Sequence, residues 1–64
     1  MKILKQDERS IIEMPKEIYV TRECVCSSAG ILGKYPTRTR ASEVLIEIFE
    51  AYENGERSYV MPEH

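Results

Sequence analysis

The fold is decided by residues 37–55, which read TRTRASEVLIEIFEAYENG. Apolar residues recur in this stretch at intervals of three and four, the spacing that places side chains on one face of an α-helix. Thr37 is a good N-cap, and Asn54-Gly55 is a typical helix stop. We therefore predict an amphipathic helix over about 38–54. Its apolar stripe would contain Ala41, Val44, Leu45, Ile48, Phe49 and Tyr52, with Glu43, Glu47, Glu50 and Glu53 largely on the solvent side.

Short strands are predicted on both sides of this helix, at about 2–6, 10–14, 18–27, 31–35 and 57–61. These runs are rich in β-branched and aromatic residues, and polar, Gly or Pro residues separate them. The predicted fold class is α+β: a small, mostly antiparallel β-sheet in the order β-β-β-β-α-β, with one helix packed on one face.

The segment 18–35 is predicted to be a hairpin, with its turn at Ser27-Ser28-Ala29-Gly30. Side chains alternate between the two faces of a strand. One alternate set of the segment 18–27 is mainly apolar and is expected to face the core, apart from its arginine. This set is Ile18, Val20, Arg22, Cys24 and Cys26.

The chain has 64 residues, of which 42% are apolar. That is enough for one small domain, residues 1–64, whose modest core calls for a supplement such as a disulfide, a metal or a partner chain. Cys24 and Cys26 are too close in sequence to staple distant segments, so we expect two small buried side chains, with a redox or metal role as the alternative. The only histidine is His64, and no metal or cofactor is predicted. A homodimer is therefore the favoured state.

Charge is unevenly distributed along the chain. Residues 1–42 carry eight Lys/Arg and five Asp/Glu, or +3, whereas residues 43–64 carry one Arg and six Glu, or −5, which gives the net charge of −2. A negative total argues against dedicated nucleic-acid binding. No apolar run reaches the roughly 18–20 residues of a membrane span, and the first residues become charged at once. We expect a cytoplasmic protein with no membrane partner.

Several segments carry a resemblance to a known group of proteins. They are Leu32-Gly33-Lys34-Tyr35-Pro36-Thr37, Arg40-Ala41, Glu43-Val44-Leu45 and Glu47-Ile48, together with Gln6-Asp7, Met14-Pro15-Lys16-Glu17 and Tyr59-Val60-Met61-Pro62. The chain resembles very short proteins of unassigned function from Gram-positive bacteria and their phages and prophages. The resemblance implies a fold and a mobile-element origin, but no activity and no catalytic residues.

Catalysis is not expected, because no Cys/His or Ser/His/Asp set is present to supply an activated nucleophile. The glutamate pairs of the helix, Glu43 with Glu47 and Glu47 with Glu50, are expected to be ordinary solvated carboxylates. An enzyme therefore remains only the least favoured alternative.

Two surfaces are candidates for binding. Lys34, Thr37, Arg38 and Arg40 gather around the predicted helix start, where free backbone N–H groups favour anions, and they form a candidate phosphate, nucleotide or nucleic-acid site. The competing interpretation is a capped helix in which Arg40 pairs with Glu43 or with a sheet carboxylate. Tyr19, Tyr35, Tyr52 and Tyr59 are candidate interface residues, because tyrosine suits half-buried positions; the alternative is that they border the core. The leading function is a non-catalytic accessory factor that binds a protein of a host or mobile element.

Overall fold

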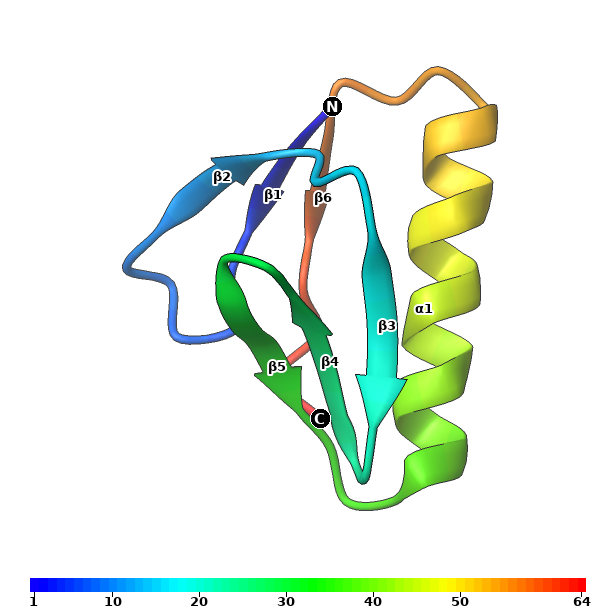
Figure 1. Ribbon diagram of the computed structural model, residues 1–64. Helices are drawn as coiled ribbons and strands as arrows, with labels where there is room; N and C mark the ends of the chain where they lie inside the picture. The colour runs from blue at the N-terminus through cyan, green and yellow to red at the C-terminus, as the bar shows by residue number, and fades with distance from the viewer.

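The computed structural model describes all residues, 1–64, as six strands and one helix. The elements are β1 (Lys2–Leu4), β2 (Ile11–Glu13), β3 (Ile18–Thr21), β4 (Cys24–Ser27), β5 (Gly30–Lys34), α1 (Arg38–Glu53) and β6 (Ser58–Val60). The strands form two three-stranded sheets, ordered β2-β1-β6 and β3-β4-β5. Figure 1 shows α1 running along one side of both sheets. The predicted α+β class with a single packed helix is confirmed, but the strands form two sheets where one was predicted.

The first sheet joins the two ends of the chain. β1 pairs antiparallel with β2 and parallel with β6, so that Ile3 has Ile12 and Tyr59 as its register partners. Parallel neighbours need a long connection, and here that connection contains the second sheet and α1. The C-terminal strand is thereby placed beside the N-terminal one (Figure 1).

The second sheet differs from the prediction, because the segment 18–27 is two strands and not one. Thr21 pairs with Cys24, and Arg22 and Glu23 form a two-residue turn in which Arg22 has φ 56°. Two-residue hairpin turns need a positive φ, which glycine or asparagine usually supplies. Arginine at this position concealed the turn in the sequence, so the predicted hairpin 18–35 is a three-stranded meander.

The added turn also changes which residues face the core. Val25, expected to point outward, is fully buried in the core cluster, whereas Cys24 and Cys26 lie on the opposite side of β4. The prediction that the two cysteines share a strand face with Ile18 and Val20 is therefore wrong, although Cys26 is one of the buried apolar residues, with 6% of its surface exposed. Both are free thiols: Cys26 is buried and Cys24 half-buried. Burial raises the pKa of the Cys26 thiol, and the neighbouring Cys24 adds to the rise.

The core lies between α1 and the two sheets. It contains eight buried residues drawn from both sheets, the helix and the C-terminal segment: Ile3, Val25, Leu32, Tyr35, Ala41, Val44, Ile48 and Met61. Only Ala41, Val44 and Ile48 come from α1. We call these three residues the inner face of α1.

The predicted helix boundaries are confirmed. Thr37 is the N-cap, and its Oγ1 accepts a hydrogen bond from the Arg40 backbone N–H at 3.1 Å. At the other end Gly55 has φ +74° and its N–H donates to the Tyr52 carbonyl, as in a helix that ends on a left-handed glycine. No helix of the structure is long and apolar enough to cross a bilayer.

Candidate functional site

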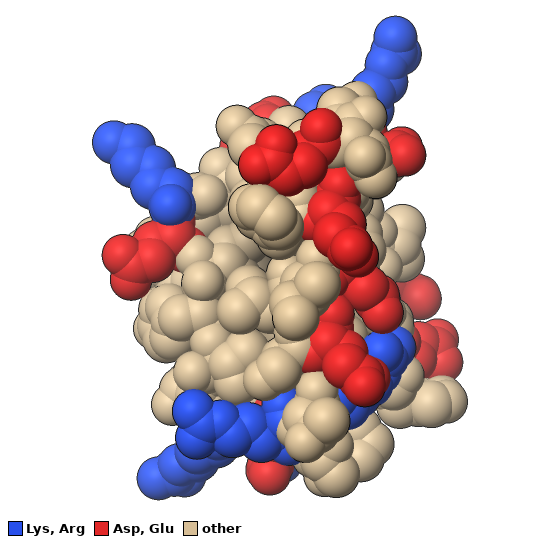
Figure 2. Space-filling view, turned by 90° about the vertical axis from the view of Figure 1, so that its right-hand side faces the viewer, with Lys and Arg blue, Asp and Glu red and all other residues tan.

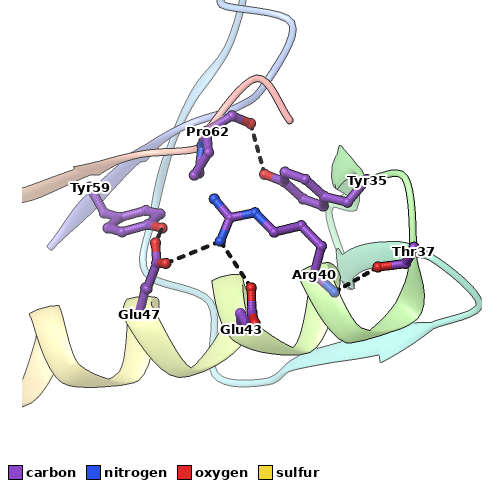
Figure 3. Close-up of polar contacts among 7 residues, drawn as sticks. All are labelled: Tyr35, Thr37, Arg40, Glu43, Glu47, Tyr59 and Pro62. Carbon is purple, nitrogen blue, oxygen red and sulfur yellow. Dashed lines mark hydrogen bonds and ion pairs between the residues drawn. The ribbon is translucent and has the colours of Figure 1, made fainter.

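A polar cluster occupies the N-terminal half of α1, where it meets the C-terminal segment (Figure 3). Arg40 Nη1 lies 3.4 Å from Glu43 Oε1 and 3.3 Å from Glu47 Oε2. The Tyr59 hydroxyl donates to Glu47 Oε1 at 2.8 Å. Arg40 therefore pairs with helix carboxylates, and Glu47 is not the freely solvated glutamate that the periodicity predicted.

Two tyrosines of this cluster hold the C-terminal segment in place. The Tyr35 hydroxyl donates to the Pro62 carbonyl at 3.0 Å, and its side chain is only 3% exposed. Burial raises the pKa of Tyr35 to about 12; Arg40 lowers it and Glu47 raises it further. Burial and the hydrogen bond to Glu47 raise the pKa of Tyr59 as well. The Tyr35 hydrogen bond joins Pro62 to the connection between β5 and α1, and the Tyr59 hydrogen bond joins β6 to α1.

Gly33 leaves the space that the Tyr35 side chain occupies. A Cβ atom at Gly33 would lie 2.7 Å from the Tyr35 hydroxyl oxygen, closer than such atoms approach in proteins. Because Gly33 has no side chain, the tyrosine ring lies directly over the β5 backbone and reaches Pro62. Tyr35 is thus a core residue, and its predicted place at an interface is wrong for this fold.

Gln6 makes a second attachment of the C-terminal segment. Its Nε2 lies 2.8 Å from the Lys34 carbonyl, 3.1 Å from that of Pro62 and 2.7 Å from that of Glu63, while the Lys34 N–H donates to Gln6 Oε1 at 2.7 Å. One amide thus joins the end of β1, the end of β5 and the C-terminal segment. No pattern in the sequence indicates contacts of such large separation.

The candidate anion-binding residues are not gathered into one site. Arg40 turns toward Glu43 and Glu47, and Thr37 uses its hydroxyl to cap the helix. Lys34 and Arg38 are exposed and form no ion pair. The competing interpretation, a capped helix in which Arg40 pairs with Glu43, describes this arrangement. No group of three or more His, Cys, Asp or Glu side chains could hold a metal ion.

The remaining tyrosines lie in different places. Tyr59 is half-buried within the polar cluster, whereas Tyr19 and Tyr52 are exposed. Tyr19 lies opposite Cys26 on the second sheet, and Tyr52 lies near the end of α1. Tyr19 is in register with Cys26, which pairs with the exposed Ile31, whereas Tyr52 adjoins an apolar surface of α1.

That surface is the solvent side of α1, which the sequence stripe assigned largely to the core. Phe49 and Tyr52 belong to the predicted stripe, yet their side chains are 59% and 55% exposed, and Ile46 is 57% exposed. Together with the half-buried Leu45 we call these residues the outer apolar face of α1. Successive helix residues are 100° apart, so the three apolar residues Val44-Leu45-Ile46 spread over a wider arc than one buried stripe. This pattern in the sequence indicates that one of them, Ile46, lies outside the core.

The outer apolar face continues across a groove onto the connection between β2 and β3. Two adjoining hollows of about 150 and 460 Å³ share Met14, Pro15 and Lys16 as a common wall. The smaller one is completed by Ile18, Leu45, Ile48 and Phe49, and the larger one by Met1, Glu13 and Tyr52. Methionine adapts readily to differently shaped apolar partners. The groove is therefore a shaped apolar surface and not a scatter of single exposed residues.

One carboxylate, Glu13, lines the larger hollow of this groove, and Lys16 lines both hollows. Figure 2 shows the face over α1, with an uncharged area beside a column of acidic side chains. The glutamates of α1, Glu43, Glu47, Glu50 and Glu53, make up the acidic positions of the helix.

Comparison with protein-family models, curated proteins and solved structures finds no match to this chain.

Proposed function

We propose that the chain works by binding another protein through the outer apolar face of α1 and the adjoining groove. The observation that carries the proposal is that Ile46, Phe49 and Tyr52 leave more than half of their side-chain surface exposed on one helix. Large contiguous apolar surfaces on small proteins mark interaction sites. On the resemblance noted above, the partner is a protein of a bacterial host or of a mobile genetic element.

The arrangement of the cations favours this proposal over phosphate binding. Arg40, which the anion-binding alternative needs at the helix start, is paired with two carboxylates. Lys34 and Arg38 alone offer two exposed charges without a shaped pocket; neither residue lines the groove. The groove combines apolar side chains with a defined shape, which is the combination that protein interfaces use at their centre.

Site-specific photo-crosslinking tests the proposal. A photoreactive phenylalanine analogue replaces Phe49 in one variant and Ile31 in a control variant; Ile31 is similarly exposed but lies on β5, outside the groove. In cells that naturally contain the chain, position 49 should give adducts of defined mass and position 31 should not. Equal labelling at both positions, or no adduct at position 49, would contradict the proposal.

Self-association is a second candidate, which the outer side of the first sheet favours. Ile11 and Val60 flank Leu4 in register and are 67% and 60% exposed. On the same side of the sheet, Lys2 lies opposite Glu13, so two copies turned toward each other could exchange this pair of charges. Light scattering should then give twice the 7.4 kDa chain mass, and Ile11→Lys should reduce it to the single mass. A single mass for the unaltered chain would contradict the homodimer.

A further inference from the structure

The C-terminal end of α1 carries the only asparagine of the chain, Asn54, which Gly55 follows directly. This end has the hydrogen bonds of a Schellman motif. The Gly55 N–H donates to the Tyr52 carbonyl at 3.1 Å, and the Glu56 N–H donates to the Ala51 carbonyl at 3.0 Å. Gly55 has a φ of +74°, a conformation that glycine adopts at little cost. Because Asn54 and Gly55 are both exposed, the helix ends on an asparagine–glycine pair in contact with solvent.

This pair has the chemical groups for intramolecular deamidation. The Gly55 amide nitrogen attacks Cγ of the Asn54 side chain, and the bond between Cγ and Nδ2 breaks. Ammonia leaves with the proton of the attacking nitrogen, and a cyclic succinimide remains. Water then opens the ring at either carbonyl carbon, which gives aspartate or isoaspartate. Glycine favours the attack because it has no Cβ beside the attacking nitrogen, and no neighbouring atom lies within 4 Å of where a Cβ of Gly55 would be.

In the folded chain the attacking nitrogen is restrained by the end of the helix. Its N–H is bonded to the Tyr52 carbonyl, and the Asn54 N–H is bonded to the Glu50 carbonyl at 2.9 Å. Ring closure needs the Gly55 nitrogen to turn toward the Asn54 Cβ, whereas the ψ of 0° places it beside the Asn54 backbone nitrogen. The reaction therefore requires the last helical turn to open. Helix ends open far more readily than a packed core, so the reaction does not require unfolding of the whole domain.

We propose that Asn54 is a site of spontaneous deamidation and that the product loosens the C-terminal turn of α1. The reaction replaces a neutral amide by a carboxylate at the end of the helix where unpaired carbonyls carry partial negative charge. Glu50 and Glu53 already lie in the last turn, which contains no basic residue. Arg57 is the next cation along the chain, but its carbonyl accepts a hydrogen bond from the Lys2 N–H and its side chain forms no ion pair. The added charge is therefore unfavourable at this position.

The modified turn is one end of the outer apolar face, because Tyr52 lies in it with more than half of its surface exposed. Isoaspartate also inserts an additional carbon atom into the backbone, so it disrupts the hydrogen bonds that close the helix. Deamidation of Asn54 therefore changes the position of Tyr52. The reaction itself is independent of the proposed function and is tested on the isolated chain.

Peptide mapping by mass spectrometry tests the site. The folded chain is incubated at neutral pH and digested with trypsin, which releases residues 41–57 as one peptide whose only amide side chain is that of Asn54. We expect this peptide to gain about 1 Da and to separate into aspartate and isoaspartate forms. Asn54→Ser removes the reacting amide and should abolish the gain. A folded chain that gains no mass, while a sample unfolded in urea does, would overturn the proposal.

Reaction rates distinguish opening of the last turn from unfolding of the domain. The chain in urea should react at least about tenfold faster than the folded chain, because no hydrogen bond then holds the Gly55 nitrogen. Ile48→Ala destabilises the core but leaves the hydrogen bonds of the last turn in place, so it should accelerate the reaction less than about threefold. Equal rates in the folded and unfolded chains, or an acceleration by Ile48→Ala in proportion to its loss of stability, would overturn the role of the last turn.

Asn54→Asp reproduces the charge of the product. Hydrogen exchange followed by NMR should show that the protection of the Gly55 and Glu56 amides is about threefold lower in this variant than in the uncharged Asn54→Ser. Ser28→Asp adds the same charge at an exposed position between β4 and β5 and should leave the protection of both amides unchanged. Equal protection in Asn54→Asp and Asn54→Ser would overturn the proposed loosening of the helix.

Discussion

The two sides of α1 are both apolar, but only one of them is covered. The inner face, Ala41, Val44 and Ile48, is at most 1% exposed against the two sheets. On the outer apolar face, Ile46, Phe49 and Tyr52 are more than half exposed, although two of them are aromatic and larger than any inner residue. Folding of this small domain thus uses the smaller side chains of the helix and leaves the larger ones available.

This difference separates the residues that stabilise the fold from the residues that we propose bind another protein. Burying a large apolar side chain stabilises a protein by about 1.5–3 kcal/mol, and Val44 and Ile48 of the inner face contribute on this scale. The outer residues contribute little to folding because water reaches them in both the folded and the unfolded chain. The predictions below test that division, beginning with the largest expected effect.

Insertion of a charge should affect the two sides very differently. Val44→Asp places an unpaired carboxylate in the core, which should cost more than about 3 kcal/mol and unfold much of the protein at 25 °C, since a chain of this size has a total stability of only about 3–10 kcal/mol. Ile46→Asp introduces the same group on the outer apolar face and should change stability by less than about 0.5 kcal/mol. Circular dichroism during urea titration measures both. Similar losses for the two variants would contradict the division.

The inner and outer sides of α1 also show how far the sequence could predict the molecule. Helical periodicity located α1 to within one residue, because caps and spacing are local properties of the chain. The same periodicity placed Phe49 in the core, since a stripe of apolar residues does not state how wide a surface the sheets will cover. How much of the helix surface the sheets cover depends on where β3 and β4 lie. The segment 18–27 is divided into these two strands at Arg22, which occupies a turn position that glycine usually fills.

The candidate site was less accessible to sequence analysis than the fold. Tyr35 was assigned to an interface and is buried, because Gly33 opens space beneath its ring. The wall formed by Met14 and Pro15 approaches α1 only in the folded chain, so the groove has no continuous signature in the sequence. Arg40 was one exception: its pairing with Glu43 follows from a separation of three residues on a helix.

Alkaline pH should weaken the attachment of the C-terminal segment on the inner side of α1. Burial raises the pKa of Tyr35 from 10.0 to about 12. A phenol with a raised pKa in the folded state contributes its full stability below pH 10 and loses it as the pH rises toward 12. The free energy of unfolding should therefore fall over this interval, and Tyr35→Phe should flatten the fall while lowering stability at pH 7 by about 1 kcal/mol.

Tyr52→Phe is the matched control for this pH dependence, because Tyr52 is exposed on the outer apolar face. It should leave the slope of stability against pH unchanged between pH 10 and 12. If Tyr35→Phe and the unaltered chain lose stability in parallel over this interval, the buried phenol is not the group responsible.

The hydrogen bond between Tyr59 and Glu47 should contribute a smaller amount. Tyr59→Phe removes a donor 2.8 Å from a carboxylate and should lower the free energy of unfolding by about 1 kcal/mol at neutral pH. Tyr19→Phe removes a hydroxyl that makes no hydrogen bond and should have almost no effect. Thermal unfolding of the two variants compares them directly, and equal midpoints would show that the bond does not hold β6 to α1.

Removing the backbone strain at Arg22 should stabilise the chain, so that larger losses of stability can be measured in the variants described above. Arg22 has a φ of 56°, a conformation that costs residues other than glycine about 1 kcal/mol. Arg22→Gly should therefore raise the free energy of unfolding by about 0.5–1 kcal/mol, which gives a wider range in which variants of both helix faces can be measured. Thr21→Gly, one residue earlier in β3, should instead lower stability. A loss of stability in Arg22→Gly would contradict the assignment of strain.

The most direct test compares two neighbouring residues, Ile48 on the inner face and Phe49 on the outer apolar face. The free energy of unfolding is measured by urea denaturation for Ile48→Ala and for Phe49→Ala. We predict a loss of about 2–4 kcal/mol for Ile48→Ala and less than about 0.5 kcal/mol for Phe49→Ala, even though the second change removes more carbon atoms. A loss for Phe49→Ala as large as that for Ile48→Ala would show that the outer apolar face serves the fold, and would contradict the claim that it is kept for a partner.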